Sequence, residues 1–322
     1  MTGNTPKTLG VVMDPIAGIH PEKDTTLGLL EAAQCKGWSL VYFEQDDLYL
    51  RDGRAHGTGR ALEVSLDPQN WFHLDEPFDT ALDDLDVILM RKDPPLDLEF
   101  MYSCCVLEYA MRAGTLVVNN PHTVRTANEK LFAQQFADLG PPTLVSRDHR
   151  RIMRFLDEHD DAVIKPLDDM GGASVFRLRK DDQNTDVTIA TVTHNGQRTV
   201  MVQGLIKDYK KGDKRILLVE GEPVPFALMR IPPPGQLRAN LAAGGHGEIS
   251  ELNERDREIC ARLAPVLRDK GLLFVGIDVI GECLTEINVS SPTCMREINA
   301  ACNLDIGTQI MDVIAKRFAA LQ

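Results

Sequence analysis

The sequence predicts a protein of two parts, an α/β region with an open, mostly parallel sheet and an α+β region with mostly antiparallel sheets. The chain has 322 residues, and a domain typically takes about 100–200 residues, so two domains are expected. Up to about residue 125, short apolar runs alternate with stretches of helical length, which is typical of a parallel sheet. Beyond that point, apolar strands follow one another through short turns, which favours antiparallel pairing.

The elements of the first region follow from its apolar runs and helix signals. Thr25 or Thr26 begins a helical pattern that Gly37 ends, and a second helix should run from about Asp97 to Arg112. The segment 91–95, "RKDPP", should lie at the carboxyl end of a strand, where open α/β sheets bind ligands. The apolar runs predict strands at 9–13, 38–43, 84–90 and 115–119.

The second region should begin with a helix from Asn128 to about Asp138, so we expect domains at 1–127 and 128–316. Residues 231–248, rich in proline and glycine, form a long stretch without a strand or helix pattern, and loops of that length are usually functional or disordered. Strands are predicted at 161–167, 174–180, 198–206, 214–221, 223–231, 272–280 and 283–289.

Composition restricts the classes of partner. Lys and Arg number 35 against 48 Asp and Glu, a net charge of −13, which is unfavourable for binding nucleic acid or an anionic membrane. No apolar run reaches the length of a membrane span, and the first residues lack a signal-peptide pattern. Seven cysteines without a C-x-x-C pair indicate free thiols in a reducing compartment, so we expect a cytoplasmic protein.

The segment 274–293 contains two apolar strands that carry carboxylates. With a turn at 281–283, Asp278 pairs with Glu286 and Gly276 with Asn288, and the polar residues occupy one face while the apolar residues occupy the other. A two-residue turn at 281–282 would mix the faces, so we expect the first register. Opposed carboxylates need a compensating cation, and oxygen ligands suit Mg²⁺, so this face is either a metal site or a solvated edge.

A glycine-rich loop follows a strand that contains a lysine, in "IKPLDDMGGASVFRL" at 164–178. Backbone N–H groups of a Gly-Gly turn can approach phosphates closely, although most such turns are only turns. Lys165 lies in an apolar strand just before the loop, which favours a phosphate-binding role. Lys130, early in the helix that begins at Asn128, would by itself be interpreted as a solvated lysine.

Taken in order, the two lysines, the glycine loop, an arginine strand and D-x7-E-x-N resemble an ATP-grasp ligase. The chain is more closely similar to bacterial glutathione synthetase, over nearly its whole length. The segments that carry this resemblance are "LGVVMDPIAGI", "DLDVILMRKDPPLDLEF", "NEKLFA", "IKPLDDMGGASVFR", "GDKRILLVEGEPVPFALMRIP", "RANLAAGGHGE" and "FVGIDVIGECLTEINVSSPTCMREI".

The resemblance implies that ATP phosphorylates the C-terminal carboxylate of γ-glutamylcysteine and that glycine attacks the acyl phosphate, giving glutathione, ADP and phosphate. It also implies Mg²⁺, with Mn²⁺ as an alternative, and a homotetramer. The implied metal ligands are Asp278, Glu286 and Asn288, and the implied nucleotide contacts are Lys130, Lys165, Gly171, Gly172, Ala173, Gln203, Gly204, Leu205, Ile206 and Asp213. The implied catalytic residues are Arg215 with Arg238 and Asn240 of a lid formed by 231–248, and the implied substrate contacts are Arg91, Ser291 and Thr293.

Two other functions fit parts of the same pattern. Another carboxylate–amine ligase, such as a D-alanine–D-alanine ligase type, would share the lysines, the glycine loop and the E-x-N motif. The segments "RKDPP" and "SSPTCMRE" favour glutathione synthetase over this alternative. A nucleotide-binding regulator without turnover would be expected to lose metal ligands, whereas Asp278, Glu286 and Asn288 are all present.

Overall fold

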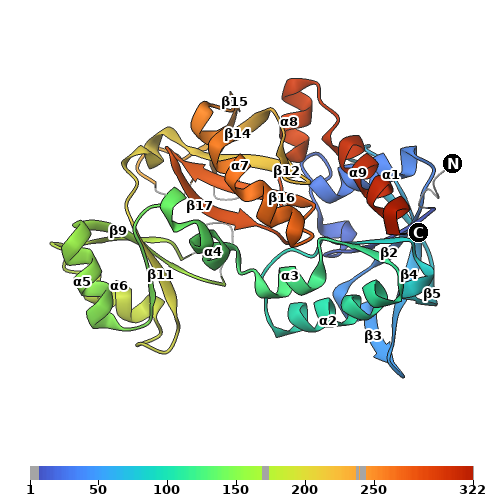
Figure 1. The fold of residues 1–322 in the computed structure, drawn as a ribbon, viewed down its shortest axis with the longest axis horizontal. Coiled ribbons are helices and arrows are strands. Elements are labelled where there is room, and N and C mark those ends of the chain that lie inside the picture. Colours follow the sequence, from blue (N-terminus) through green and yellow to red (C-terminus); the bar gives the residue numbers. More distant parts are fainter. Residues whose placement is uncertain (1–6, 169–173, 237–238, 240–243, 322) are drawn as a thin grey trace.

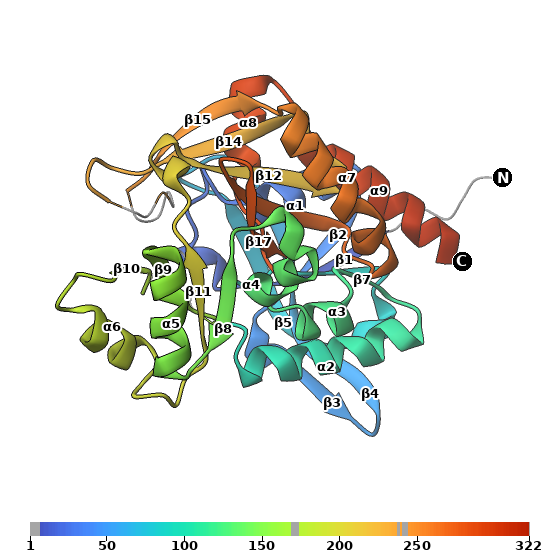
Figure 2. The same cartoon turned by 60° about the vertical axis from the view of Figure 1, so that its left-hand side comes forward.

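The computed structural model describes residues 7–168, 174–236, 239 and 244–321. Figure 1 shows a large sheet with helices on both sides, an antiparallel sheet beside it, and a small lobe that projects from the rest. The turned view of Figure 2 shows the small lobe separate from the two larger sheets. This arrangement confirms the predicted fold class, an α/β part followed by antiparallel sheets.

The N-terminal sheet is mixed. Parallel pairing joins β1 to β2 and β6, and β6 to β7, as predicted, whereas β3, β4 and β5 pair in antiparallel fashion and extend the sheet. Its order is β3-β4-β2-β1-β6-β7, with β5 on β4. The strands are β1 (Thr8–Val12), β2 (Ser39–Phe43), β3 (Leu48–Arg51), β4 (Arg54–Val64), β5 (Phe72–Ala81), β6 (Val87–Met90) and β7 (Leu116–Val118).

The antiparallel extension was not predicted, because the first half of β4 faces the core with small residues, Ala55, Gly57 and Gly59. A Cβ added at Gly57 or Gly59 would come within 2.8 Å of the Phe43 ring, so the aromatic side chain occupies the space above both glycines. The first half of β4 therefore lacks the β-branched and large apolar residues that predict a strand from sequence, and Leu62 and Val64 in its second half are too few to do so alone.

Helices cover both faces of the N-terminal sheet. Helices α1 (Thr25–Cys35) and α9 (Ile306–Leu321) pack together on one face, and α2 (Leu98–Ala113) and α3 (Pro121–Thr126) pack on the other. Asp24 caps α1 by accepting from the Leu27 amide at 2.6 Å. Because α9 comes from the end of the chain, the N-terminal layer is completed by residues far away in sequence. The domain boundaries at 127 and 316 stay a prediction.

The small lobe is an antiparallel sheet with its own core. Its order is β10-β9-β11-β8, and residues such as Ile164 and Val202 pack under Ile152 and Leu156 of α5. The elements are β8 (Thr143–Ser146), α5 (His149–His159), β9 (Asp161–Pro166), β10 (Phe176–Arg179), α6 (Thr185–Val192) and β11 (Val200–Gly204).

The C-terminal sheet is antiparallel throughout, in the order β15-β14-β12-β16-β17 with β13 on β12. Helix α7 covers its apolar face, and α8 lies beside β14 and β15. The elements are α4 (Glu129–Phe132), β12 (Asp213–Val219), β13 (Glu222–Pro223), β14 (Phe226–Ile231), β15 (His246–Glu251), α7 (Glu254–Asp269), β16 (Phe274–Ile280), β17 (Cys283–Asn288) and α8 (Met295–Cys302). Short 3-10 helices lie at Ile16–Gly18, Gln45–Asp47, Leu82–Asp84, Ala133–Leu139 and Lys207–Lys211.

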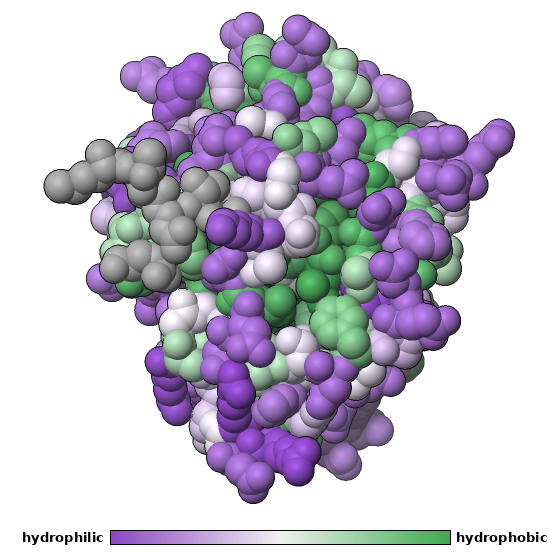
Figure 3. Space-filling view, turned by 90° about the vertical axis from the view of Figure 1, so that its right-hand side faces the viewer, coloured by the Kyte–Doolittle hydropathy of each residue, from purple (hydrophilic) through white to green (hydrophobic). Residues whose placement is uncertain are grey.

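The described helices include none with the length and apolar character needed to cross a membrane. Figure 3 shows the side of the molecule at the right of Figure 1, whose surface is largely hydrophilic around a hydrophobic area near its centre. A cavity of about 290 Å³ lies close to the C-terminal end of α9, lined by Leu116, Val117, Leu272, Leu273 and Leu321 among others.

Candidate active site

The β16–β17 hairpin has the predicted pairing of Asp278 with Glu286 and of Gly276 with Asn288. The predicted three-residue turn is wrong, because Ile280 pairs with Cys283 and leaves a two-residue turn. A bulge between Asp278 and Val279 reconciles the two registers.

Thr285 is the additional residue on β17, and its hydroxyl donates to the Asp278 carbonyl at 3.1 Å. The bulge lets the apolar residues of both strands face the core while the carboxylates stay together on the opposite face. Val275, Ile277, Val279 and Ile287 all lie in the main hydrophobic core, as predicted.

Two arginines from neighbouring strands hold Asp278. Arg215 on β12 donates from Nε to Oδ1 at 2.6 Å and from its terminal nitrogen to Oδ2 at 3.1 Å, a bidentate contact. Arg230 on β14 approaches the same Oδ1 at 2.9 Å. Burial would raise the pKa of Asp278, but the two guanidinium groups outweigh burial and lower it. Asp278 is only 4% exposed, so this face is not a solvated edge.

Asp213 extends this cluster on β12. Its Oδ2 accepts from Arg230 at 2.5 Å, while its Oδ1 is buried and has no hydrogen bond among the described residues. Burial raises the pKa of Asp213 to about 7, and the nearby negative charges of Asp278 and Glu286 act in the same direction, against Arg230. Asp213, Arg230, Asp278 and Arg215 therefore form a row of alternating charges across the sheet.

A second ion pair joins the small lobe to the C-terminal sheet. Lys165 on β9 donates from Nζ to Glu286 Oε1 on β17 at 3.0 Å. Burial alone would raise the pKa of Glu286, but Lys165 and Lys130 outweigh it and lower the pKa. Lys130 on α4 is 7% exposed, so the lysine that resembled a solvated one in isolation is buried beside the carboxylates.

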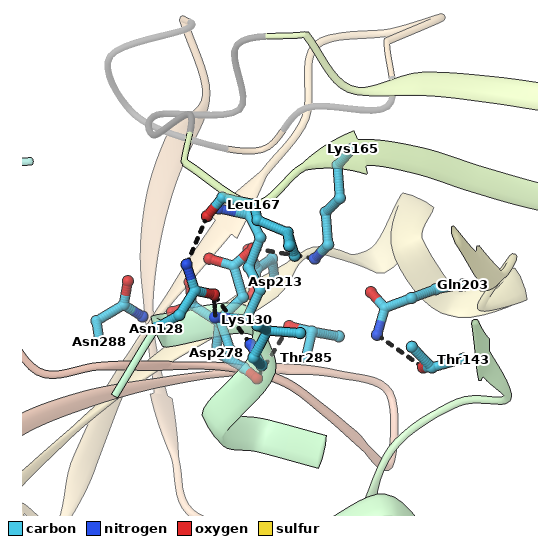
Figure 4. Close-up of polar contacts among 12 residues, drawn as sticks. Asn128, Lys130, Thr143, Lys165, Leu167, Gln203, Asp213, Asp278, Thr285 and Asn288 are labelled. Carbon is cyan, nitrogen blue, oxygen red and sulfur yellow. Dashed lines mark hydrogen bonds and ion pairs between the residues drawn. The ribbon is translucent and has the colours of Figure 1, made fainter. Parts of the chain in front are cut away.

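The end of β9 and the start of α4 are tied together above this site. The Asn128 side chain caps α4 and donates to the Leu167 carbonyl at 3.0 Å, just before the glycine loop (Figure 4). The loop residues predicted to cover phosphates, Gly171, Gly172 and Ala173, lie outside the described residues. The same holds for Arg238 and Asn240 of the predicted lid.

The predicted adenine segment lies where β11 leaves the small lobe. Gln203 is buried and donates from Nε2 to the Thr143 hydroxyl at 3.1 Å (Figure 4). The amides of Gly204 and Leu205 donate to the carbonyls of Pro142 and Asp161, at 2.9 and 3.0 Å. These bonds fix the segment at the edge of the small lobe as far as Leu205, and Ile206 follows before the chain enters the C-terminal sheet.

A cleft of about 810 Å³ runs from this cluster to the N-terminal part. One wall contains Arg215, Arg230 and Asn288 of the C-terminal sheet together with the predicted substrate contacts Ser291 and Thr293. The other wall is formed by residues 14–15, 18–20, 23–25 and 93–94, beyond the carboxyl ends of β1 and β6. The volume of the cleft is within the range of about 300–1,000 Å³ that is typical of small-molecule sites.

Arg91, the third predicted substrate contact, is buried behind this cleft. Its Nε donates to the Thr26 hydroxyl at 3.1 Å and its terminal nitrogen to the Pro292 carbonyl at 3.0 Å. The guanidinium also lies over the Phe274 ring, 5.6 Å from the centroid. In this structure Arg91 therefore holds the segment that carries Ser291 and Thr293 against α1.

The donor set on the hairpin is suited to a metal that arrives with a nucleotide. Among the described residues, no three His, Cys, Asp or Glu side chains gather into a group that could hold a metal ion. Mg²⁺ is commonly bound by one or two carboxylates together with phosphate oxygens and water, so Glu286, Asn288 and Asp278 fit such a site. Asp278 already has three close arginine contacts, and a carboxylate has about four lone-pair sites.

Sequence reasoning missed Arg230, which contacts both Asp213 and Asp278. The available signal was an arginine inside the apolar strand "FALMRI", where a buried charge needs a partner. It also missed Glu129, whose Oε1 accepts from the Ser290 hydroxyl at 2.8 Å and from the Val289 amide at 3.1 Å. These contacts fix the segment that leaves the hairpin toward the cleft.

Family models match both parts of the chain. The model of the prokaryotic glutathione synthetase N-terminal domain matches residues 8–125, and that of the prokaryotic glutathione synthetase ATP-grasp domain matches residues 129–303. The chain belongs to the prokaryotic glutathione synthetase family. The family predicted from the sequence is thereby confirmed, and the D-alanine–D-alanine ligase type is not favoured.

Curated relatives match this chain over almost its full length. The chain is 54% identical to glutathione synthetase of Pseudomonas aeruginosa, 52% to that of Yersinia pestis and 48% to that of Vibrio cholerae. In each case 97% of this chain and 98% of the relative are covered.

Solved structures share the fold at low identity. The D-cycloserine synthetase DcsG matches with a TM-score of 0.68 at 17% identity, over 97% of this chain and 99% of that chain. The ATP-grasp ligase PsnB, bound to its minimal precursor, matches with a TM-score of 0.62 at 16% identity, over 98% and 99%. These likenesses support the ATP-grasp fold.

Proposed function

We propose that the protein joins γ-glutamylcysteine and glycine to form glutathione, with conversion of ATP to ADP and phosphate. Membership of the glutathione synthetase family, over both parts of the chain, carries this proposal. A cleft of suitable size that begins at a cluster of buried cations supports it.

In this proposal the carboxylate of γ-glutamylcysteine attacks the γ-phosphorus of ATP, and ADP leaves. The amine of glycine then attacks the acyl carbon, phosphate leaves, and the amine loses its proton. Phosphoryl transfer depends on positioning and charge neutralisation more than on a protein nucleophile. We assign that neutralisation to Lys130 and Lys165 at the phosphates and to Arg215 at the transferred phosphoryl group, with the glycine loop at 171–173 covering them.

The remaining nucleotide contacts follow the same reasoning. Residues 203–206 would receive adenine between the small lobe and the C-terminal sheet. Asp213 would receive a ribose hydroxyl on Oδ1, the oxygen that has no hydrogen bond among the described residues. Asp278, Glu286 and Asn288 would hold Mg²⁺, or Mn²⁺ in its place. Such an ion neutralises phosphate charge and polarises the phosphoryl oxygens when it is bound.

Arg91, Ser291 and Thr293 would fix the dipeptide, with Arg91 acting through the segment it supports. An acyl phosphate is readily hydrolysed, so we assign water exclusion to the lid at 231–248, with Arg238 and Asn240. We also propose the division at 1–127 and 128–316, a homotetramer, and a cytoplasmic location. The hydrophobic area in Figure 3 supports subunit contacts, and the seven cysteines, all free, support a reducing compartment.

The release of ADP tests the function. Purified protein with ATP and Mg²⁺ should release ADP when γ-glutamylcysteine and glycine are both present, and glutathione should form in equal amount. D-Alanine in place of both substrates is the control and should give no turnover. Turnover with D-alanine alone would identify the other ligase class, and ATP binding without turnover on any carboxylate–amine pair would identify a regulator.

A further inference from the structure

Glu297, in the first turn of α8, lines the cleft, and its carboxylate has no hydrogen bond or ion pair with the described residues. Its Oε2 is buried and has no hydrogen bond among the described residues. It also takes part in none of the ion pairs found in the described part of the chain. Leaving a carboxylate oxygen buried and unsatisfied is costly, so such an atom calls for a donor.

Three of the other four carboxylates that line the cleft are already engaged. Asp14 accepts from the Asp93 amide at 2.8 Å and pairs with Lys92 at 2.7 Å. Asp24 caps α1, as described above, and Glu129 accepts from the segment after β17. The fourth, Asp93, is half-buried and has no buried oxygen without a hydrogen bond. Glu297 therefore differs from all four, because one of its carboxylate oxygens is buried and has no hydrogen bond among the described residues.

The position of Glu297 relative to the reacting groups indicates its ligand. Residues 288–297 form one wall of the cleft, beginning at the hairpin face and ending on α8. Cys294 lies between the two ends. Burial raises the pKa of its thiol, the positive charges of Arg215 and Arg230 act to lower it, and the negative charge of Glu297 acts to raise it, so all three side chains lie near this thiol. The cleft thus has cations at the phosphoryl end and a carboxylate farther along the same wall.

The substrate has a complementary order of charges. The reacting carboxylate of γ-glutamylcysteine must lie near Arg215, and the other end of the molecule carries an α-ammonium group with three N–H donors. We propose that Glu297 binds this α-ammonium and so selects a γ-glutamyl group, an inference that rests on the proposed function. Charge-assisted hydrogen bonds of this kind are stronger than neutral ones.

Glutarylcysteine tests this assignment, because it is γ-glutamylcysteine with hydrogen in place of the α-amino group. Steady-state ADP release should be measured with both compounds for the wild type, Glu297→Gln and Glu22→Gln. Glu22 is exposed and is not part of the cleft lining, so its variant controls for the loss of one negative charge.

We expect Glu297→Gln to raise the KM for γ-glutamylcysteine by about 10- to 100-fold and to leave the KM for ATP and for glycine unchanged. The kcat at saturation should stay within a few-fold, and the KM for glutarylcysteine should be the same as in the wild type. The Tm without substrate should be unchanged or higher, because an unsatisfied carboxylate is removed. Glu22→Gln should behave as the wild type.

Three outcomes would overturn the assignment. The first is an equal ratio of the two KM values in the wild type and Glu297→Gln. The second is a selective rise in the KM for glycine, which would show that Glu297 binds the amine of glycine instead. The third is a lower Tm with all KM values raised, as expected of a purely structural residue. Failure of the wild type to use γ-glutamylcysteine would instead remove the proposed function, and this inference with it.

Discussion

Buried cations and carboxylates hold one another in place in the site before any nucleotide binds. Lys165 pairs with Glu286 across the lobes, and Arg215 with Asp278 within the sheet. Each pair fixes the direction of long side chains, so less conformational entropy remains to be lost when phosphates arrive. In the proposed function, nucleotide and metal charges would take over the positions that these paired side chains now hold.

Replacement of Glu286 by glutamine tests its role at the phosphates. An amide has the same shape but cannot neutralise Lys165 or contribute a negative ligand, so we expect ADP release to fall by about 100-fold or more. The free energy of unfolding should fall by only about 1–3 kcal/mol, because Lys165 keeps an acceptor. Glu282→Gln, in the exposed turn of the same hairpin, is the control. Near-normal turnover by folded Glu286→Gln would contradict the assignment.

The pH dependence of stability tests Asp213. Its pKa is raised from 3.8 to about 7 in the folded protein. Between these values the native state keeps a proton that the unfolded chain releases, so this contribution to stability is complete below pH 3.8 and is lost as the pH rises through about 7.

Asp213→Asn lacks that contribution. Its free energy of unfolding relative to the wild type should therefore increase between pH 5 and pH 8, by on the order of 2 kcal/mol. Urea unfolding at the two pH values measures the difference. Parallel pH profiles for the two proteins would show that Asp213 does not titrate in this range.

An ion pair links helix α7 to the C-terminal sheet on the face opposite the site. Lys214, next to Arg215 on β12, donates to both oxygens of Asp256 at 2.7 and 2.6 Å. Asp256 also accepts from the Asn253 amide in the capping box of α7. The strand that carries Arg215, the proposed catalytic arginine, is thus anchored by a buried ion pair on its other face.

Breaking this ion pair should cost stability. Asp256→Asn leaves a buried ammonium without its counter-ion, so urea unfolding should show a loss of about 3–5 kcal/mol. Adding Lys214→Met removes the stranded charge and should recover much of that loss. If Asp256→Asn and the wild type had the same free energy of unfolding, the ion pair would contribute nothing. If the double variant were as unstable as Asp256→Asn, the loss would come from the helix cap instead.

The side chain of Asn119 makes four hydrogen bonds that join the two large sheets. Asn119, just after β7, accepts at Oδ1 from the Leu273 and Phe274 amides at 2.8 and 3.0 Å. Its Nδ2 donates to the Phe274 and Val289 carbonyls at 2.7 and 2.8 Å. The side-chain amide of Asn119 therefore forms the kind of hydrogen bonds that a backbone peptide group forms, here between the N-terminal sheet and the hairpin. These bonds position the cleft walls relative to one another.

Asn119→Asp should lower the free energy of unfolding by about 2–6 kcal/mol, because two buried carbonyls lose their donor and gain a repelling charge. Thermal unfolding measures this loss. Asn120→Asp is a matched control, since Asn120 caps α3 and aspartate caps equally well. A similar Tm for Asn119→Asp and the control would contradict the bridging role.

Much of the fold and the site could be predicted from local pattern. The strands of the hairpin, the pairing of Asp278 with Glu286 and the helix that begins at Asn128 depend on period, turn residues and caps, which are local properties. The fold class followed from the order of such segments, whereas the family followed from the resemblance of longer sequence segments. The bulge at Thr285 was not predicted, because a regular hairpin has a single register, whereas the packed sheet combines the expected pairing of Asp278 with Glu286 and a two-residue turn.

The sequence alone determined which segments form strands and helices and which side chains carry charge in apolar surroundings. Only the tertiary structure decided which charges meet. Arg230 reaches Asp278, Asn119 reaches Phe274 and Glu297 faces the cleft through strand order and helix placement. Local preferences act over a few residues, whereas these contacts join residues up to 170 positions apart, and such contacts are fixed only when the core closes.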